Sequence, residues 1–200
     1  MKNIPNILTV TRLILVPLFI FFAFASFCPG NLYIAFAIFA IASITDFLDG
    51  YLARKYNVVS NIGKFLDPIA DKVLMLAGLI CLCYFMFIYN VFTTAVIICV
   101  FLCVFIIIAR DYIVDAIRQI AGVAGKVIPA DIYGKLKTFV QDFALPILVL
   151  YYALIFNSGL ANTGIVQVVG YIGLALFFIG AILSVASGIN YFVKNKDILK

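Results

Sequence analysis

The sequence predicts an all-α integral membrane protein with six transmembrane helices, and three observations support this fold class. Hydrophobic residues make up 66% of the chain and charged residues only 12%, whereas soluble domains are about half apolar and about a quarter charged. The mean hydropathy is +1.21. Six apolar runs come close to the roughly 20 residues that a transmembrane helix needs. They use most of the 200 residues, so we expect residues 1–200 to form a single membrane-embedded domain.

The six runs are separated by polar connections, of which the fourth is the longest. The first run also has a small-residue pattern typical of signal-peptide cleavage, Ala23-Phe24-Ala25, but we expect it to be retained as a membrane helix. Before it, Ile4, Ile7 and Leu8 have helical spacing, which predicts a short interfacial helix within residues 1–12. The runs are Leu13–Phe27, Leu32–Leu52, Ile69–Tyr89, Val91–Ala109, Phe139–Phe156 and Ile165–Phe192.

The composition excludes several kinds of chemistry. All nine acidic residues are Asp, and the chain has neither Glu nor His. Histidine-based nucleophilic catalysis and histidine metal sites are therefore excluded. The five cysteines lie in or beside apolar runs, and the spacing of Cys81 and Cys83 does not suit a zinc or redox pair. We interpret them as buried, inert thiols.

The basic residues predict the orientation in the membrane. All fourteen Lys and Arg residues precede the first run, lie in or beside the second and fourth connections, or belong to the C-terminal tail. The other three connections carry no charge. Because basic residues stay in the cytosol, both termini are expected there. The net charge of +5 is explained by this topology and by attraction to anionic lipids, without a nucleic-acid partner.

Four aspartates mark a candidate metal site. Asp46 and Asp49 end the second run, and Asp67 and Asp71 begin the third. Carboxylates at membrane depth are costly and usually functional. Residues three or four apart share a helix face, and the short connection brings the two pairs together. Converging carboxylates repel unless a cation binds, and oxygen ligands favour Mg²⁺ or Mn²⁺, with enough ligands for two ions.

Simpler explanations exist for the individual acids. Asp67 precedes Pro68, a pattern typical of a helix N-terminus. The acids of the second run could form ion pairs with Arg54 and Lys55. Each explanation accounts for one or two acids, whereas a metal site accounts for all four.

The segment around these acids is similar to a known signature. Asp46-Phe-Leu-Asp49-Gly50-Tyr-Leu-Ala53-Arg54, eight further residues, and Gly63-Lys-Phe-Leu-Asp67-Pro-Ile-Ala-Asp71 resemble the signature of the CDP-alcohol phosphotransferases. All eight signature positions match with the family's spacing. The resemblance implies six spans with cytosolic termini, and a homodimer.

The resemblance also implies an activity. A phosphatidyl group passes from a CDP-linked lipid to an alcohol, and CMP is released. The four aspartates would bind the metals, and Asp71 would also act as the general base. Gly50, Ala53 and Arg54 would lie against the cytidine diphosphate, and Gly63 would permit its close approach.

The N-terminal segment resembles the family segment that helps to hold the nucleotide. Its Asn and Thr side chains correspond to Asn6 and Thr9 in this sequence. An interfacial anchor without ligand contact is an equal alternative.

The fourth connection is rich in cations. Arg110, Arg118, Lys135 and Lys137 could form a pocket for an acceptor that carries phosphate. Alternatively, these residues signal topology and form local pairs, such as Asp115 with Arg118 or Asp111 with a neighbour.

This connection and the opening Asn-Ile-Pro-Asn-Ile-Leu-Thr resemble the bacterial phosphatidylglycerophosphate synthases within the family. The resemblance implies CDP-diacylglycerol and sn-glycerol 3-phosphate as substrates, and a bacterial cytoplasmic membrane with a cytosolic active site. Synthases that use serine, inositol phosphate, phosphatidylglycerol or CDP-choline are competing interpretations. A transporter with an acidic ion site is a remote one, because the sequence shows no internal repeat.

Overall fold

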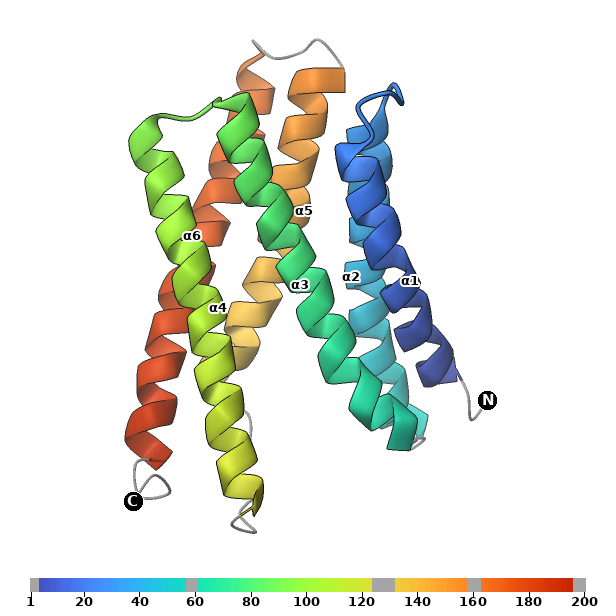
Figure 1. Cartoon of the computed structure of the whole chain (residues 1–200), viewed down its shortest axis with the longest axis vertical. Helices are drawn as coiled ribbons and strands as arrows, with labels where there is room; N and C mark the ends of the chain where they lie inside the picture. Colours follow the sequence, from blue (N-terminus) through green and yellow to red (C-terminus); the bar gives the residue numbers. More distant parts are fainter. Residues whose placement is uncertain (1–3, 57–60, 124–131, 158–162, 196–200) are drawn as a thin grey trace. The chain divides into compact units, whose positions relative to one another are not determined.

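The computed structural model describes residues 4–56, 61–123, 132–157 and 163–195 (Figure 1). Within these ranges, the side chains at 4–7, 47–56, 61–65 and 67 lie outside the description. The described residues form six α-helices and no strand, so the prediction of an all-α fold is confirmed. The helices are α1 (Ile4–Phe24), α2 (Asn31–Tyr56), α3 (Asn61–Tyr89), α4 (Thr94–Val123), α5 (Ile132–Asn157) and α6 (Gly164–Asn195).

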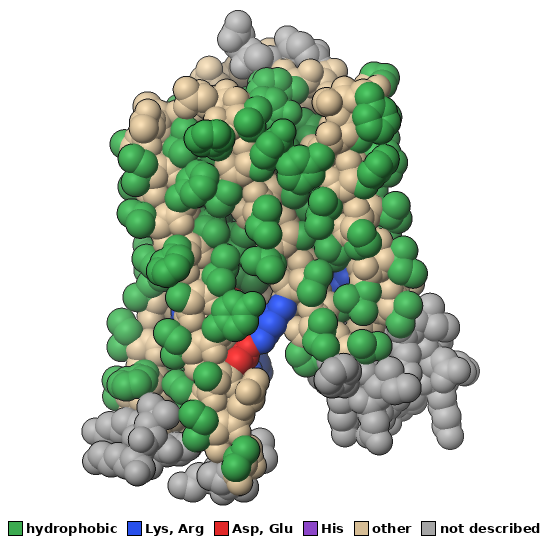
Figure 2. Space-filling view, in the orientation of Figure 1, with side chains coloured by type: hydrophobic (Ala, Val, Ile, Leu, Met, Phe, Trp, Pro, Cys, Tyr) green, Lys and Arg blue, Asp and Glu red, His purple; other side chains and the backbone are tan. Residues whose placement is uncertain are grey.

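The helices are those of a membrane protein. Four of them contain described segments long and apolar enough to cross a bilayer: Pro68–Tyr89, Thr94–Val123, Ile132–Asn157 and Gly164–Asn195. The described apolar parts of the other two helices, Leu8–Phe24 and Asn31–Asp46, are shorter. Hydrophobic side chains dominate the visible surface of the helices, as expected for contact with lipid (Figure 2).

The helices extend beyond the apolar runs at their charged ends. α4, for example, continues fourteen residues past Ala109, the end of its apolar run, to Val123. An apolar run reports only the part of a helix that suits lipid, whereas backbone hydrogen bonding continues through charged residues. Residues 4–12 are likewise the first turns of α1, not a separate helix. Pro68 lies inside α3, so it does not begin that helix as the N-terminal pattern suggested.

The chain divides into two units, and α3, α5 and α6 contribute to both. Unit 1 contains Met1–Phe85 and Leu145–Gly170, and unit 2 contains Met86–Ala144 and Tyr171–Lys200. The aspartate signature therefore belongs to unit 1 and the four candidate acceptor cations to unit 2.

In unit 1, α1 and α2 form an antiparallel hairpin (Figure 1). Gly30 adopts the left-handed conformation at the turn, with φ of 78°, which suits glycine because it has no Cβ. The side-chain Nδ2 of Asn31 donates to the backbone carbonyl of Phe22 across the hairpin at 3.0 Å. Phe19 and Phe39 pack with their ring centroids 4.9 Å apart. These contacts fix the register that aligns the ends of α1 and α2.

In unit 2, α4 packs against α6. Val114 and Ile117 form a buried cluster with Tyr191. The first half of α5 joins them, because a Cβ atom placed at Gly180 of α6 would lie 2.9 Å from Cγ of Gln141. Small residues at such positions let helices approach closely inside a bilayer.

Candidate functional site

The signature end of unit 1 contains a buried ion pair. Nη1 of Arg12 lies 2.5 Å from Oδ1 of Asp46, and the Arg12 side chain is only 1% exposed compared with 33% for Asp46. Thr9, one turn before Arg12 in α1, is fully buried. α1 thus supplies a positive charge directly beside one of the predicted metal ligands.

Asp71 lies in α3 and is partly exposed. Its side chain, like that of Asp46, keeps access to the surroundings, as a ligand or a base requires. The remaining predicted residues of this region have side chains outside the description: Asn6, Asp49, Gly50, Ala53, Arg54, Gly63 and Asp67.

The donor chemistry of this region fits a hard divalent cation. The signature places two carboxylates on α2 and two on α3 at helical spacings of three and four residues. Carboxylate oxygens are the ligands that Mg²⁺ and Mn²⁺ prefer. Among the side chains that the structure describes, no group of three or more possible ligands is assembled, since Asp49 and Asp67 are not among them.

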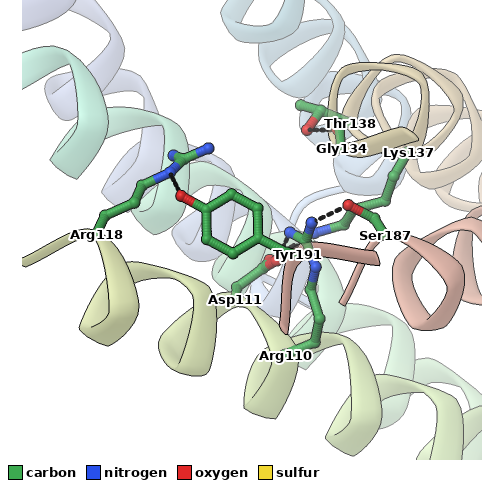
Figure 3. Close-up of polar contacts among 8 residues, drawn as sticks. All are labelled: Arg110, Asp111, Arg118, Gly134, Lys137, Thr138, Ser187 and Tyr191. Carbon is green, nitrogen blue, oxygen red and sulfur yellow. Dashed lines mark hydrogen bonds and ion pairs between the residues drawn. The ribbon is translucent and has the colours of Figure 1, made fainter. Parts of the chain in front are cut away.

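In unit 2 one carboxylate joins two of the predicted acceptor cations (Figure 3). Nζ of Lys137 donates to both carboxylate oxygens of Asp111 at 2.6 Å. Nη1 of Arg110 donates to Oδ1 of the same carboxylate at 2.8 Å. The Lys137 side chain is 3% exposed and that of Arg110 14%. α4 and α5 are therefore connected by a network with two cations and one anion.

The other side of Arg110 is held by α6. Its Nη2 donates to the hydroxyl of Ser187. A Cβ atom at Gly188 would lie 3.0 Å from Cγ of Arg110, and one at Gly134 would lie 3.4 Å from Nη2. Because glycine leaves this space open, the long Arg110 side chain fits between α4, α5 and α6.

Arg118 lies two turns further along α4 and reaches Tyr191 (Figure 3). Its Nε donates to the Tyr191 hydroxyl at 3.1 Å, and its Cζ lies 5.5 Å from the centre of the ring. Tyr191 is 2% exposed, whereas Arg118 itself is exposed. The arrangement fixes the stem of Arg118 and leaves its outer nitrogens accessible.

Lys135 and Lys137 lie on different sides of α5. Residues two apart in a helix do not share a face, and Lys135 is exposed while Lys137 is 2% exposed. The structure therefore brings Arg110 and Lys137 together at Asp111, but it does not bring Lys135 to that carboxylate.

Sequence reasoning did not assign four residues that make these contacts. The sequence predicts no role in the site for Arg12, Ser187 or Tyr191, and for Asp111 it predicts only a local pair. The pairing of Arg110 with Asp111 confirms that alternative in part, but the contact with Lys137 is not local. The available signal for Arg12 was its position, because a charged residue directly at the start of an apolar run lies close to membrane depth.

Taken together, these features define an α-helical membrane protein with a carboxylate-rich region in one unit and a cation-rich cluster in the other. The profile of the CDP-alcohol phosphatidyltransferase family matches residues 2–185. The chain belongs to this family, which confirms the resemblance of the aspartate signature and identifies the protein as a transferase.

Individual relatives are similar over nearly their whole length. Proteins named CDP-diacylglycerol–glycerol-3-phosphate 3-phosphatidyltransferase include one of Rickettsia typhi, 35% identical with 96% of both chains covered. One of Bacillus subtilis is 36% identical, with 100% of this chain and 98% of its own covered. One of Haemophilus influenzae is 35% identical, with coverage of 94% and 91%.

Proposed function

We propose that this protein transfers the phosphatidyl group of CDP-diacylglycerol to sn-glycerol 3-phosphate, forming phosphatidylglycerol phosphate and CMP. The observation that carries the proposal is the similarity along the entire chain to relatives named for this reaction. The complete aspartate signature and the cation cluster of unit 2 support the same assignment.

The proposed reaction is a displacement at phosphorus. The primary hydroxyl oxygen of the acceptor attacks the phosphorus that carries the diacylglycerol. The bond from that phosphorus to the bridging oxygen breaks, and CMP leaves with the electron pair. Asp71 takes the proton of the attacking hydroxyl, and its partial exposure is compatible with that role.

Asp46, Asp49, Asp67 and Asp71 would hold two divalent cations, Mg²⁺ or Mn²⁺. Such ions neutralise the pyrophosphate and stabilise the charge of the departing phosphate. Gly50, Ala53, Arg54 and Gly63 would accommodate the cytidine diphosphate, with Asn6 and Thr9 as additional contacts. Thr9 and Arg12 are both buried, so the face of α1 that carries them packs in the interior of unit 1.

Arg110, Arg118, Lys135 and Lys137 would hold the phosphate of the acceptor. Charge-assisted hydrogen bonds suit a phosphate dianion. The described contacts favour Arg110, Lys137 and Arg118 as the principal residues, because Asp111, Ser187 and Tyr191 already restrain them. Lys135 would contribute from the exposed side of α5.

The assay that tests the function uses purified protein, CDP-diacylglycerol, Mg²⁺ and a panel of labelled acceptors. We expect turnover of glycerol 3-phosphate and little turnover of glycerol, serine or inositol phosphate. Turnover of serine or inositol phosphate alone would preserve the family assignment and overturn the acceptor.

We further propose six spans in a bacterial cytoplasmic membrane, with both termini and the active site on the cytosolic side, and a homodimer. The absence of Lys and Arg from three of the five connections supports this orientation. In a cysteine-free variant, single cysteines at Ser26, which is exposed in the first connection, and at Asn157 should react with an impermeant reagent from outside intact cells. Cysteines at Lys64 and Lys135 should not. Asn31 and Lys137 are unsuitable as reporters, because their burial alone would prevent labelling. Reaction of Lys64→Cys from outside would overturn the topology.

A further inference from the structure

We propose that Asp111 is a positioning residue of the acceptor site, which holds the Arg110 and Lys137 cations together in the arrangement that receives a phosphate. The inference rests on the proposed function, because it concerns the acceptor of that reaction. It assigns to Asp111 a role that neither the aspartate signature nor the predicted cation set includes.

The first argument is the convergence of two helices on one carboxylate. Arg110 and Asp111 belong to α4 and Lys137 to α5, and both cations contact Asp111 at 2.6–2.8 Å (Figure 3). Two cations this close to each other repel, and a shared anion offsets that repulsion. Asp111 therefore makes it possible for both charges to occupy one site.

The second argument is the burial of Lys137. Lys137 lies on α5 between Gly134, which lies against Ser187 of α6, and Gln141, which lies against Gly180 of α6. Lys137 is 2% exposed. An ammonium group in such an interior needs anionic or polar partners in place of water. The carboxylate of Asp111, accepting on both oxygens, meets this need.

The third argument is that donors remain for a ligand. Asp111 accepts one hydrogen bond from Arg110, and Ser187 accepts another. A guanidinium carries further N–H groups in a planar fork that matches phosphate oxygens. Asp111 is 24% exposed and Arg110 14%, so both side chains keep access to the surroundings. The cluster has an excess of one positive charge over Asp111 and is thus suited to a phosphate.

The test compares Asp111→Asn, Asp111→Glu and Asp115→Asn in detergent with CDP-diacylglycerol saturating or varied. Asp111→Asn should raise the KM for glycerol 3-phosphate by about tenfold and leave kcat and the KM for the lipid within about twofold. The Ki of inorganic phosphate as a competitor should rise in parallel. Asp111→Glu, which retains the charge, should restore much of the affinity. Asp115→Asn removes the same charge from the same helix and should change the KM little.

A double variant keeps the inference testable if Asp111→Asn folds poorly. Asp111→Asn/Lys137→Met removes both members of the pair, which avoids an uncompensated buried charge. If Asp111 acts by positioning Lys137, the double variant should have a KM close to that of Lys137→Met alone, since the two changes are not additive.

Three results would overturn the inference: an unchanged or lowered KM in Asp111→Asn, an equal effect of Asp115→Asn, or full additivity in the double variant. A lowered KM would instead make Asp111 a competitor of the phosphate. Failure of the proposed function is distinguishable, because it would appear as absence of glycerol 3-phosphate turnover by the wild-type protein.

Discussion

The two units use an arginine–aspartate pair for opposite purposes. In unit 1 the buried cation of Arg12 stands beside Asp46, one of four signature aspartates. In unit 2 a single carboxylate, Asp111, stands between two cations, Arg110 and Lys137. Counted over the four signature aspartates and Arg12, the charge is negative, and counted over Arg110, Lys137 and Asp111 it is positive.

This difference indicates what each region attracts. An excess of carboxylates needs further positive charge, which divalent cations supply. An excess of ammonium and guanidinium groups needs further negative charge, which a phosphate supplies. The membrane surroundings strengthen both preferences, because charges are screened less there than in water. Arg12 and Asp111 set how large each of these two excesses is before the ligand binds.

The largest expected effect is on catalysis in unit 1. Asp71→Asn preserves size but removes the basic oxygen, and turnover should fall about a thousandfold. The thermal unfolding midpoint should stay near that of the wild type. Asp197→Asn makes the same change outside the signature and should remain active.

EDTA should abolish wild-type turnover, and Mg²⁺ or Mn²⁺ should restore it. Near-normal turnover of Asp71→Asn, or full activity in EDTA, would contradict the metal-dependent mechanism.

The next effect tests the buried Arg12 beside Asp46 in unit 1. Arg12→Met leaves Asp46 without its buried arginine, and breaking a fully buried pair costs about 3–5 kcal/mol. Because Asp46 is one-third exposed, we expect a loss nearer to about 2 kcal/mol, or a midpoint lowered by about 4–8 °C. Arg12→Lys should recover part of this loss.

Divalent cation gives a second measurement on the same variant. If Arg12 offsets the repulsion among the signature carboxylates, Mg²⁺ should raise the midpoint of Arg12→Met more than that of the wild type. Equal midpoints with and without Arg12 would show that the contact contributes nothing, and the parallel with unit 2 would fail.

The sequence predicted the elements better than their contacts. Six apolar runs correspond to the six helices, because lipid requires a continuous apolar stretch. The helix ends were less predictable, since charged residues such as those around Arg118 continue a helix without prolonging its apolar run. The family was predictable from the spacing of the signature, and the profile match confirms it. The roles of the signature residues stay predictions.

The contacts of unit 2 depend on long-range packing. Arg110 and Ser187 are 77 residues apart, and Arg118 and Tyr191 are 73 apart. No local pattern joins such positions. A partial signal was nevertheless present on α5, where Gly134, Lys137 and Gln141 recur at helical spacing. This stripe of small and polar residues predicts an interhelical face, and it would have distinguished Lys137 from Lys135.

A smaller effect concerns the accessible cation of unit 2. Arg118→Ala should raise the KM for glycerol 3-phosphate by about tenfold, since a charge-assisted contact contributes about 1.5–3 kcal/mol. The KM for CDP-diacylglycerol should change much less. Kinetics with each substrate varied in turn would measure both. If the KM for the lipid rises instead, Arg118 serves the nucleotide, and the contrast between the two units is wrong.

The smallest effect isolates the group that orients Arg118. Tyr191→Phe removes the hydroxyl that accepts from Nε of Arg118 but keeps the ring below the guanidinium and its packing against Val114 and Ile117. Because Arg118 is exposed, water can replace the lost acceptor, so the KM for glycerol 3-phosphate should rise only about two- to threefold.

Tyr191→Leu also removes the ring, and with it a cation–π contact, so its KM should lie between those of Tyr191→Phe and Arg118→Ala. Thermal unfolding of Tyr191→Phe should match the wild type, which separates orientation from stability. A KM for Tyr191→Phe as high as that for Arg118→Ala would mean that the hydroxyl itself, and not the guanidinium it orients, provides the contact with the acceptor.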